Sequence, residues 1–155
     1  MFVSPTKGIL NWSDMLRDIE ENLVGSSADQ YKIIIGTDSQ MSKETCLVTA
    51  VVLYQVGKGA CYYYRKKTHR QLKSLRQRIF YEAALSLEVA SQLTQLLAEK
   101  GYPDLELEIH LDIGQKGQTK DMIQEVVGMV IGSGFDAKIK PDSYGATKVA
   151  DKHTK

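Results

Sequence analysis

The sequence predicts an α/β fold in which a five-stranded mixed β-sheet is flanked by helices on both faces. Two observations support this prediction. Between residues 31 and 68, three runs rich in β-branched and aromatic residues follow one another with short connections, as in an antiparallel meander. From residue 74 onward, helical and extended patterns alternate, and the long helix before the fourth strand allows that strand to run parallel to the first.

The composition is that of an ordinary globular protein. The 155 residues are 43% hydrophobic and 25% charged, with a net charge of +1, and a chain of this length is expected to form one domain. We expect residues 1–28 to supply a leading helix and residues 29–155 the core. No apolar run reaches the roughly 18 residues of a transmembrane helix, the start lacks a secretion signal, and cysteines are few. These features predict a cytoplasmic protein.

The leading helix is predicted for residues 11–24, with Ser13 as a candidate N-cap. Its apolar residues recur with a helical period and predict one buried face: Met15, Leu16, Ile19 and Leu23. This region indicates packing and no chemistry.

The first strand of the core is a short apolar run that ends in an aspartate. Residues 31–35 are mostly apolar, as expected for a strand buried on both faces, and Gly36-Thr37-Asp38 follows them. In open α/β sheets, ligands bind at the carboxyl ends of strands. Asp38 therefore either holds a negative charge at this edge or only begins a turn with Ser39.

A hairpin is predicted next, with strands over residues 45–56 and 60–68. Its second strand opens a stretch of basic residues without an intervening acid: Arg65, Lys66, Lys67, Arg70, Lys73, Arg76 and Arg78. Such a cluster suits phosphate groups, and the adjoining Tyr62, Tyr63 and Tyr64 could stack on bases of a nucleic acid. The alternative is a solvated charged face that is balanced elsewhere. We expect His69, inside the cluster, to neighbour phosphate rather than to bind a metal.

A long helix is predicted over residues 74–100. At about 100° per residue, four apolar residues share one face: Leu75, Ile79, Leu93 and Leu97. Glu82 lies within this stripe, whereas Glu88 points away from it. A carboxylate inside an apolar face needs a partner, a cation or a proton. Glu82 is therefore either part of a charged site or a structural glutamate bonded to the neighbouring strand.

The fourth strand, over residues 105–112, alternates apolar and polar residues and also ends in an aspartate, Asp112. If this strand lies beside the first, Asp38 and Asp112 are about 5 Å apart. Two ionised carboxylates at that spacing repel each other unless a proton or a metal lies between them. We expect His110, in the same strand, to be a surface or packing residue.

Three further elements are predicted. A helix capped by Thr119 runs to residue 131, a strand covers residues 136–140, and a final helix carrying Asp151 covers residues 146–154. Lys116 and Lys120 flank the N-terminus of the helix that begins at Thr119, where a phosphate of a nucleic-acid backbone could bind. A solvated loop explains the two lysines equally well.

The order of these elements and the positions of their acids resemble the ribonuclease H-like fold, from Tyr31 to the C-terminus. Asp38 matches the first-strand aspartate of that superfamily, Glu82 its helix glutamate and Asp112 its fourth-strand aspartate. The fourth acid is either Asp151, which we favour, or Asp142, which directly follows the last strand. Residues 36–40, 140–146 and 149–154 resemble segments of the small, uncharacterised YkuK-type bacterial family.

This resemblance implies a metal-dependent nuclease that acts on RNA, DNA or a hybrid. In the superfamily these carboxylates bind two divalent cations, and an oxygen-rich site selects Mg²⁺ or Mn²⁺. Two such ions about 4 Å apart activate a water and stabilise the leaving oxygen. Asp38 would bridge both ions, with Glu82 and Asp112 on one of them and Asp151 or Asp142 on the other. His153 is a candidate for moving a proton at the leaving group.

One departure from the superfamily pattern concerns the substrate, because the last two strands are joined by one helix without a separate basic protrusion. The grip on the substrate must therefore come from elsewhere. A first alternative to the nuclease is a nucleic-acid-binding module of the same fold without turnover. A second is a phosphotransferase or ATPase, but the sequence has no glycine-rich phosphate loop. The sequence leaves the oligomeric state open.

Overall fold

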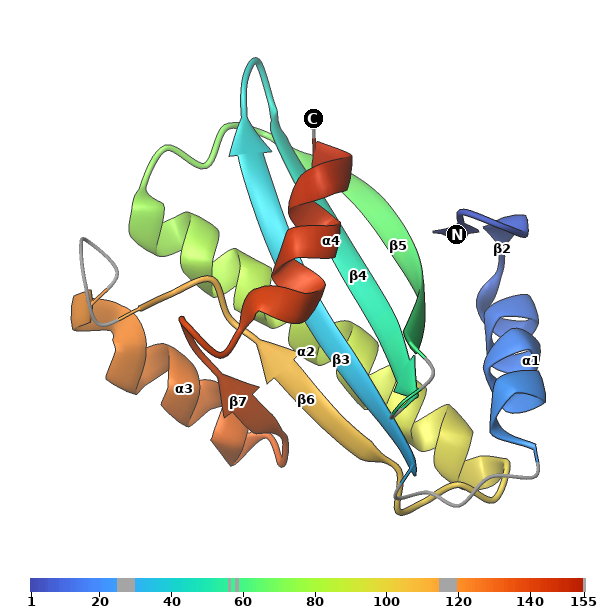
Figure 1. Cartoon of the computed structure of the whole chain (residues 1–155). Helices are drawn as coiled ribbons and strands as arrows, with labels where there is room; N and C mark the ends of the chain where they lie inside the picture. Colours follow the sequence, from blue (N-terminus) through green and yellow to red (C-terminus); the bar gives the residue numbers. More distant parts are fainter. Residues whose placement is uncertain (25–29, 56, 58, 115–119, 155) are drawn as a thin grey trace.

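The computed structural model describes residues 1–24, 30–55, 57, 59–114 and 120–154. Within these ranges the chain forms a seven-stranded sheet with the order β2-β1-β5-β4-β3-β6-β7 (Figure 1). The strands are β1 (Phe2–Ser4), β2 (Gly8–Leu10), β3 (Tyr31–Met41), β4 (Thr45–Gln55), β5 (Gly59–His69), β6 (Glu106–His110) and β7 (Asp136–Lys138).

The predicted number of five strands was wrong, because an N-terminal hairpin adds two more. β1 and β2 pair with each other, and Val3 of β1 pairs with Tyr64 of β5, so the hairpin extends the sheet beyond the meander. Each of these strands has three residues, too few to show the alternation by which a strand is recognised in a sequence.

The other five strands have the predicted arrangement. β3, β4 and β5 are eleven residues long and form an antiparallel meander. β6 pairs parallel to β3, and β7 pairs parallel to β6. The sheet is therefore mixed, and the parallel strands all deliver their carboxyl ends to one edge.

Helices cover both faces of the sheet (Figure 1). The larger core joins α1 (Trp12–Leu23), α2 (Leu75–Glu99) and α3 (Ile123–Gly132) to apolar residues of β3 such as Ile33 and Ile35. α4 (Tyr144–Thr154) crosses the opposite face, where Ala146 and Ala150 belong to a smaller apolar cluster. None of the helices in the described ranges is both long and apolar enough to cross a membrane.

The helix starts agree with the predictions only in part. The side chain of Ser74 caps α2 by accepting a hydrogen bond of 3.3 Å from the backbone N–H of Gln77. α1 is capped by Asn11, which accepts a bond of 2.8 Å from the N–H of Asp14, so the predicted cap Ser13 lies inside the helix. The predicted cap Thr119 lies outside the described residues.

A glycine in β3 lets α4 approach the sheet closely. A Cβ at Gly36 would lie 2.9 Å from the Cβ of Ala146 and 3.2 Å from the backbone nitrogen of Thr147. Atoms cannot pack so closely, so a larger residue at position 36 would push α4 away. This contact fixes the height of α4 above β3 and thereby the position of the acid that α4 carries.

Candidate active site

Two aspartates lie at one edge of the sheet, Asp38 inside β3 and Asp112 just beyond the end of β6. The expectation that the first strand of the core ends at Asp38 was wrong, because β3 stays paired with β4 as far as Met41. Gly36 pairs with His110, so Asp38 and Asp112, each two residues further on, are neighbours across this pair. Both line a cavity of about 630 Å³. Further wall residues come from β3, from the segment before α4 and from α4: Ser39, Gln40, Lys140, Pro141, Ser143, Thr147, Lys148 and Asp151.

Glu82 reaches this edge from α2, the helix that covers the opposite face of the sheet from α4. Its side chain belongs to the buried face of the helix and is only 8% exposed. Ser39, next to Asp38 in β3, donates a hydrogen bond of 2.5 Å from its Oγ to Oε2 of Glu82. The glutamate is therefore bonded to the neighbouring strand and lies close enough to Asp38 and Asp112 to be affected by their charge. Sequence reasoning did not identify Ser39 as its partner.

Asp151 supplies a third aspartate from α4. Its carboxyl group is hydrogen-bonded to that of Asp38, and both groups line the same cavity. Asp142 does not reach this cavity and instead lines a second one, on the same face of the sheet as His110. The structure thus brings Asp151, and not Asp142, to Asp38.

The crowding of these acids changes their protonation. Burial and the hydrogen bond with Asp151 raise the pKa of Asp38 to about 7, and the charges of Asp112 and Asp151 act in the same direction. Burial is also the main cause that raises the pKa of Glu82 to about 8, although the hydrogen bond from Ser39 opposes it. Carboxyl groups with such pKa values hold protons near neutral pH that a cation can replace.

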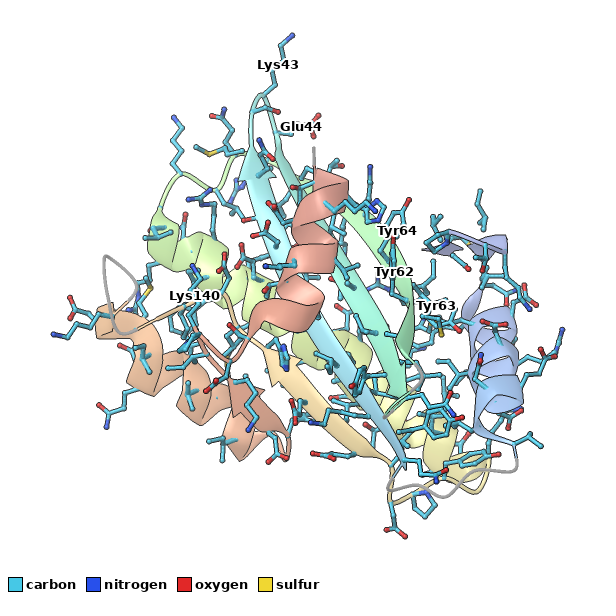
Figure 2. All side chains as sticks on the ribbon, in the orientation of Figure 1. Lys43, Glu44, Tyr62, Tyr63, Tyr64 and Lys140 are labelled. Carbon is cyan, nitrogen blue, oxygen red and sulfur yellow. The ribbon has the colours of Figure 1, made fainter. Side chains whose placement is uncertain are left out.

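A lysine that sequence reasoning missed lies against the cluster. Lys140, on the segment between β7 and α4 (Figure 2), places its Nζ 2.8 Å from Oδ1 of Asp112. Since His110 pairs with Lys138 in the parallel strands β6 and β7, Asp112 and Lys140 are the next residues that face each other. The strand register would have revealed this pair, but the sequence does not give the register.

The chemistry of the donors fits a hard divalent cation. Asp38 and Asp151 already share a hydrogen bond, which requires a proton between two carboxyl groups, and a cation with oxygen ligands can take that place. Across the described residues, however, no three acid, histidine or cysteine side chains are arranged around one point as metal ligands. Metal binding would therefore require these side chains to move.

Comparisons with known proteins agree with this geometry. A family model described as "Ribonuclease H-like" matches residues 14–155, most of the chain. The chain belongs to the ribonuclease H-like family. It is also 36% identical, over an alignment of 167 positions that covers all of this chain and 97% of the relative, to a protein of Bacillus subtilis (strain 168) named "Uncharacterized protein YkuK". The predicted YkuK-type membership is confirmed.

In this ribonuclease H-like protein, His153 is not part of the carboxylate cavity. Its ring stacks on Tyr64 at 3.8 Å between centroids, and its Nε2 lies 3.0 Å from the hydroxyl of Tyr62. Both tyrosines lie along β5 (Figure 2). Desolvation, with the charges of Lys152 and Lys66, lowers the pKa of His153. The histidine is therefore an aromatic partner of β5 on the far side of α4 from Asp151.

The basic residues of this ribonuclease H-like protein do not form one patch. Successive strand residues point to opposite faces, so Lys66 lies on the face of Asp38, whereas Arg65 and Lys67 lie on the other. The Arg65 guanidinium sits 5.3 Å over the Phe2 ring. Arg70 and Lys73 are exposed between β5 and α2.

The remaining predicted residues lie apart from the carboxylates. Lys120 is exposed in a short 3-10 turn, Lys120–Met122, before α3, and Lys116 lies outside the described residues. His110 is buried and bonded through Nε2 to Glu108 at 3.0 Å, so of the two predicted alternatives, a surface or a packing residue, it is the packing one.

Proposed function

We propose that this protein is a nuclease that uses Mg²⁺ or Mn²⁺ to hydrolyse phosphodiester bonds of RNA or DNA. The observation that carries the proposal is the convergence of Asp38, Asp112 and Asp151 on one cavity from three different elements, with the buried Glu82 beside them. An ordinary structural role does not require four acids at one place, because their mutual repulsion destabilises the fold.

The side chains of the site have distinct tasks in this proposal. Asp38, Asp151 and Glu82 would hold the metal, and Ser39 would keep the carboxylate of Glu82 oriented through its hydrogen bond. When bound, the metal supplies a water of lowered pKa as nucleophile and positive charge for the phosphate oxygens. Lys148, on the cavity wall, is placed to attract the phosphate backbone of the substrate.

Further contacts with the nucleic acid would come from the face of the sheet that α4 crosses. Lys66 lies on this face two strands away from Asp38, roughly 10 Å at the usual strand spacing. Tyr62, Tyr64 and His153 form an aromatic group on the same strand and helix. Cationic and aromatic groups in one groove are typical of single-stranded nucleic acid binding.

A second candidate function is a nucleic-acid-binding module that does not cleave. The ion pair between Lys140 and Asp112 favours it, because a lysine already compensates one of the acids. In that case the basic and aromatic residues would bind the strand, and the carboxylates would have no catalytic task.

The test is a cleavage assay with labelled single-stranded, duplex and hybrid oligonucleotides in the presence of Mg²⁺ or Mn²⁺. We expect Asp38→Asn to abolish cleavage while its thermal unfolding shows an intact fold, and Asp104→Asn, an exposed acid outside the site, to behave as the wild type. Unchanged cleavage by Asp38→Asn would reject the nuclease. Calorimetry that detects oligonucleotide binding but no Mn²⁺ binding would instead support the binding module.

A further inference from the structure

Lys140 forms an ion pair with one acid of the carboxylate cluster, Asp112. Its ammonium nitrogen lies on the cavity wall, 2.8 Å from a carboxylate oxygen of Asp112. This is the length of a charge-assisted hydrogen bond. The ammonium group is a compact, strongly hydrated point charge, so it resembles a small hard cation in what it offers to a carboxylate.

The main chain holds Lys140 at this place. Its N–H donates a hydrogen bond of 2.8 Å to the carbonyl of Ile113, and the N–H of Leu111 donates one of 2.9 Å to the carbonyl of Lys138. These bonds continue the parallel pairing beyond β6 and β7. A Cβ at Gly114 would lie 3.1 Å from the Cβ of Lys140. Because glycine has no Cβ, Gly114 leaves space for the first atoms of the Lys140 side chain. The Asp112–Lys140 pair is thus set by backbone register.

The two halves of the cluster differ in what they have available for a metal. Asp38 has another acid, Asp151, as a hydrogen-bond partner, and Glu82 accepts a bond from the neutral hydroxyl of Ser39. Asp112, by contrast, already has a full positive charge beside it. A divalent ion at Asp112 would have to displace the ammonium group or lie next to a like charge.

We propose that the ammonium group of Lys140 takes the place of one of the two divalent ions implied by the ribonuclease H-like resemblance, so that the cluster binds a single Mg²⁺ or Mn²⁺ ion. The inference rests on the proposed function, because it assigns the metal content of the same site. In the substrate complex, the ammonium group stabilises negative charge on the phosphate. Its side chain is 60% exposed and that of Asp112 is 36% exposed, so the pair opens onto the cavity from which the phosphate arrives.

Mn²⁺ binding to the metal-free protein tests this arrangement. Titration calorimetry and electron paramagnetic resonance give the number of ions and show whether two of them are close together. We expect the wild type to bind one ion per chain and Lys140→Met to bind a second one, with the spin coupling of two neighbouring Mn²⁺ ions. Lys148→Met is the matched control, since Lys148 lines the same cavity but has no ion pair among the described side chains, and it should still bind one ion.

The outcomes separate this inference from the nuclease proposal. Two comparable sites in the wild type, or a single site in Lys140→Met and its conservative partner Lys140→Gln, overturn the role of Lys140 and leave a two-ion nuclease possible. Appearance of the second site in Lys148→Met as well would also overturn it, because the effect would then be one of general charge. No Mn²⁺ binding by the wild type or either Lys140 variant rejects both proposals together.

Discussion

The two helices that bring acids to this edge of the sheet hold them in different ways. α2 presents Glu82 from within the larger core, where the side chain is almost fully buried and bonded to Ser39. α4 presents Asp151 as an exposed residue, on a helix supported by a small cluster of alanines and valines. The broad apolar face of α2 positions Glu82, whereas one close contact between α4 and β3 positions Asp151. The α2 side and the α4 side of the site should therefore respond differently to mutation.

The largest effect is expected when either acid is neutralised. Glu82→Gln and Asp151→Asn should each lower the rate of metal-dependent cleavage by about 100-fold or more, because ligand charge stabilises the metal that carries the transition state. Steady-state cleavage of a labelled oligonucleotide measures this loss.

Two exposed acids serve as controls for that comparison. Glu88 lies on the solvent side of α2, and Asp142 lies before α4 and lines the second cavity. The control variants are Glu88→Gln and Asp142→Asn. Both should retain wild-type cleavage. If Asp142→Asn were as inactive as Asp151→Asn, the assignment of the fourth acid to α4 would be wrong.

The next effect concerns the pH dependence of stability, to which the buried Glu82 should contribute. The pKa of Glu82 is raised from 4.5 to about 8 by folding, so between these pH values the folded state holds a proton that the unfolded state has lost. The free energy of unfolding of the metal-free protein should therefore fall as the pH rises through this window, by a few kcal/mol.

Chemical denaturation at a series of pH values, in the presence of a chelator, measures this slope. Glu82→Gln should reduce the slope, since glutamine does not titrate, and should leave the part that is due to Asp38, whose pKa is also raised, to about 7. Glu88→Gln should keep the full slope. An unchanged slope in Glu82→Gln would show that the buried glutamate is not the source of the pH dependence.

A smaller effect is expected on the α4 side. Gly36→Ala places a methyl group against Ala146 and Thr147 and should cost about 1–3 kcal/mol of stability, with a loss of cleavage because Asp151 moves with α4. Thermal unfolding measures the cost. Gly128→Ala in α3, where an added Cβ meets nothing within 4 Å, is the matched control and should be as stable as the wild type or more so.

The smallest effect is expected for Ser39→Ala. It removes the hydrogen bond to Glu82 but leaves every acid in place, so cleavage should fall about tenfold, as for other residues that orient a metal ligand. Ser42→Ala, on the exposed hairpin whose tip carries Lys43 and Glu44 (Figure 2), should have no effect. Equal rates for Ser39→Ala and the wild type would leave Ser39 a purely structural residue.

The difference between the two sides also explains what the sequence could predict. Glu82 is recognisable because a carboxylate interrupts an apolar helical stripe, and Asp38 and Asp112 because each comes at the end of an apolar or alternating run in the sequence. Lys140 is not, because its pairing with Asp112 depends on the register of β6 and β7, two strands that are separated by α3 and aligned by packing of the whole domain.

Two other differences between prediction and structure have separate causes. The hairpin of β1 and β2 depends on a contact between Val3 and Tyr64, which lie far apart in the chain, and its short strands carry no pattern. His153 was expected near the carboxylates because it is two residues from Asp151, but two residues of an α-helix are separated by about 200°. The helical period therefore sends it to β5 instead.

The ends of the sheet have a consequence for the behaviour of the protein in concentrated solution. Both outermost strands, β2 and β7, are three residues long, so a passing chain finds few unpaired backbone groups on which to add another strand. Long, exposed edge strands are the usual starting points of intermolecular β-sheet formation and fibril growth. We therefore expect the folded protein to resist such assembly although its central strands are long and rich in valine and isoleucine.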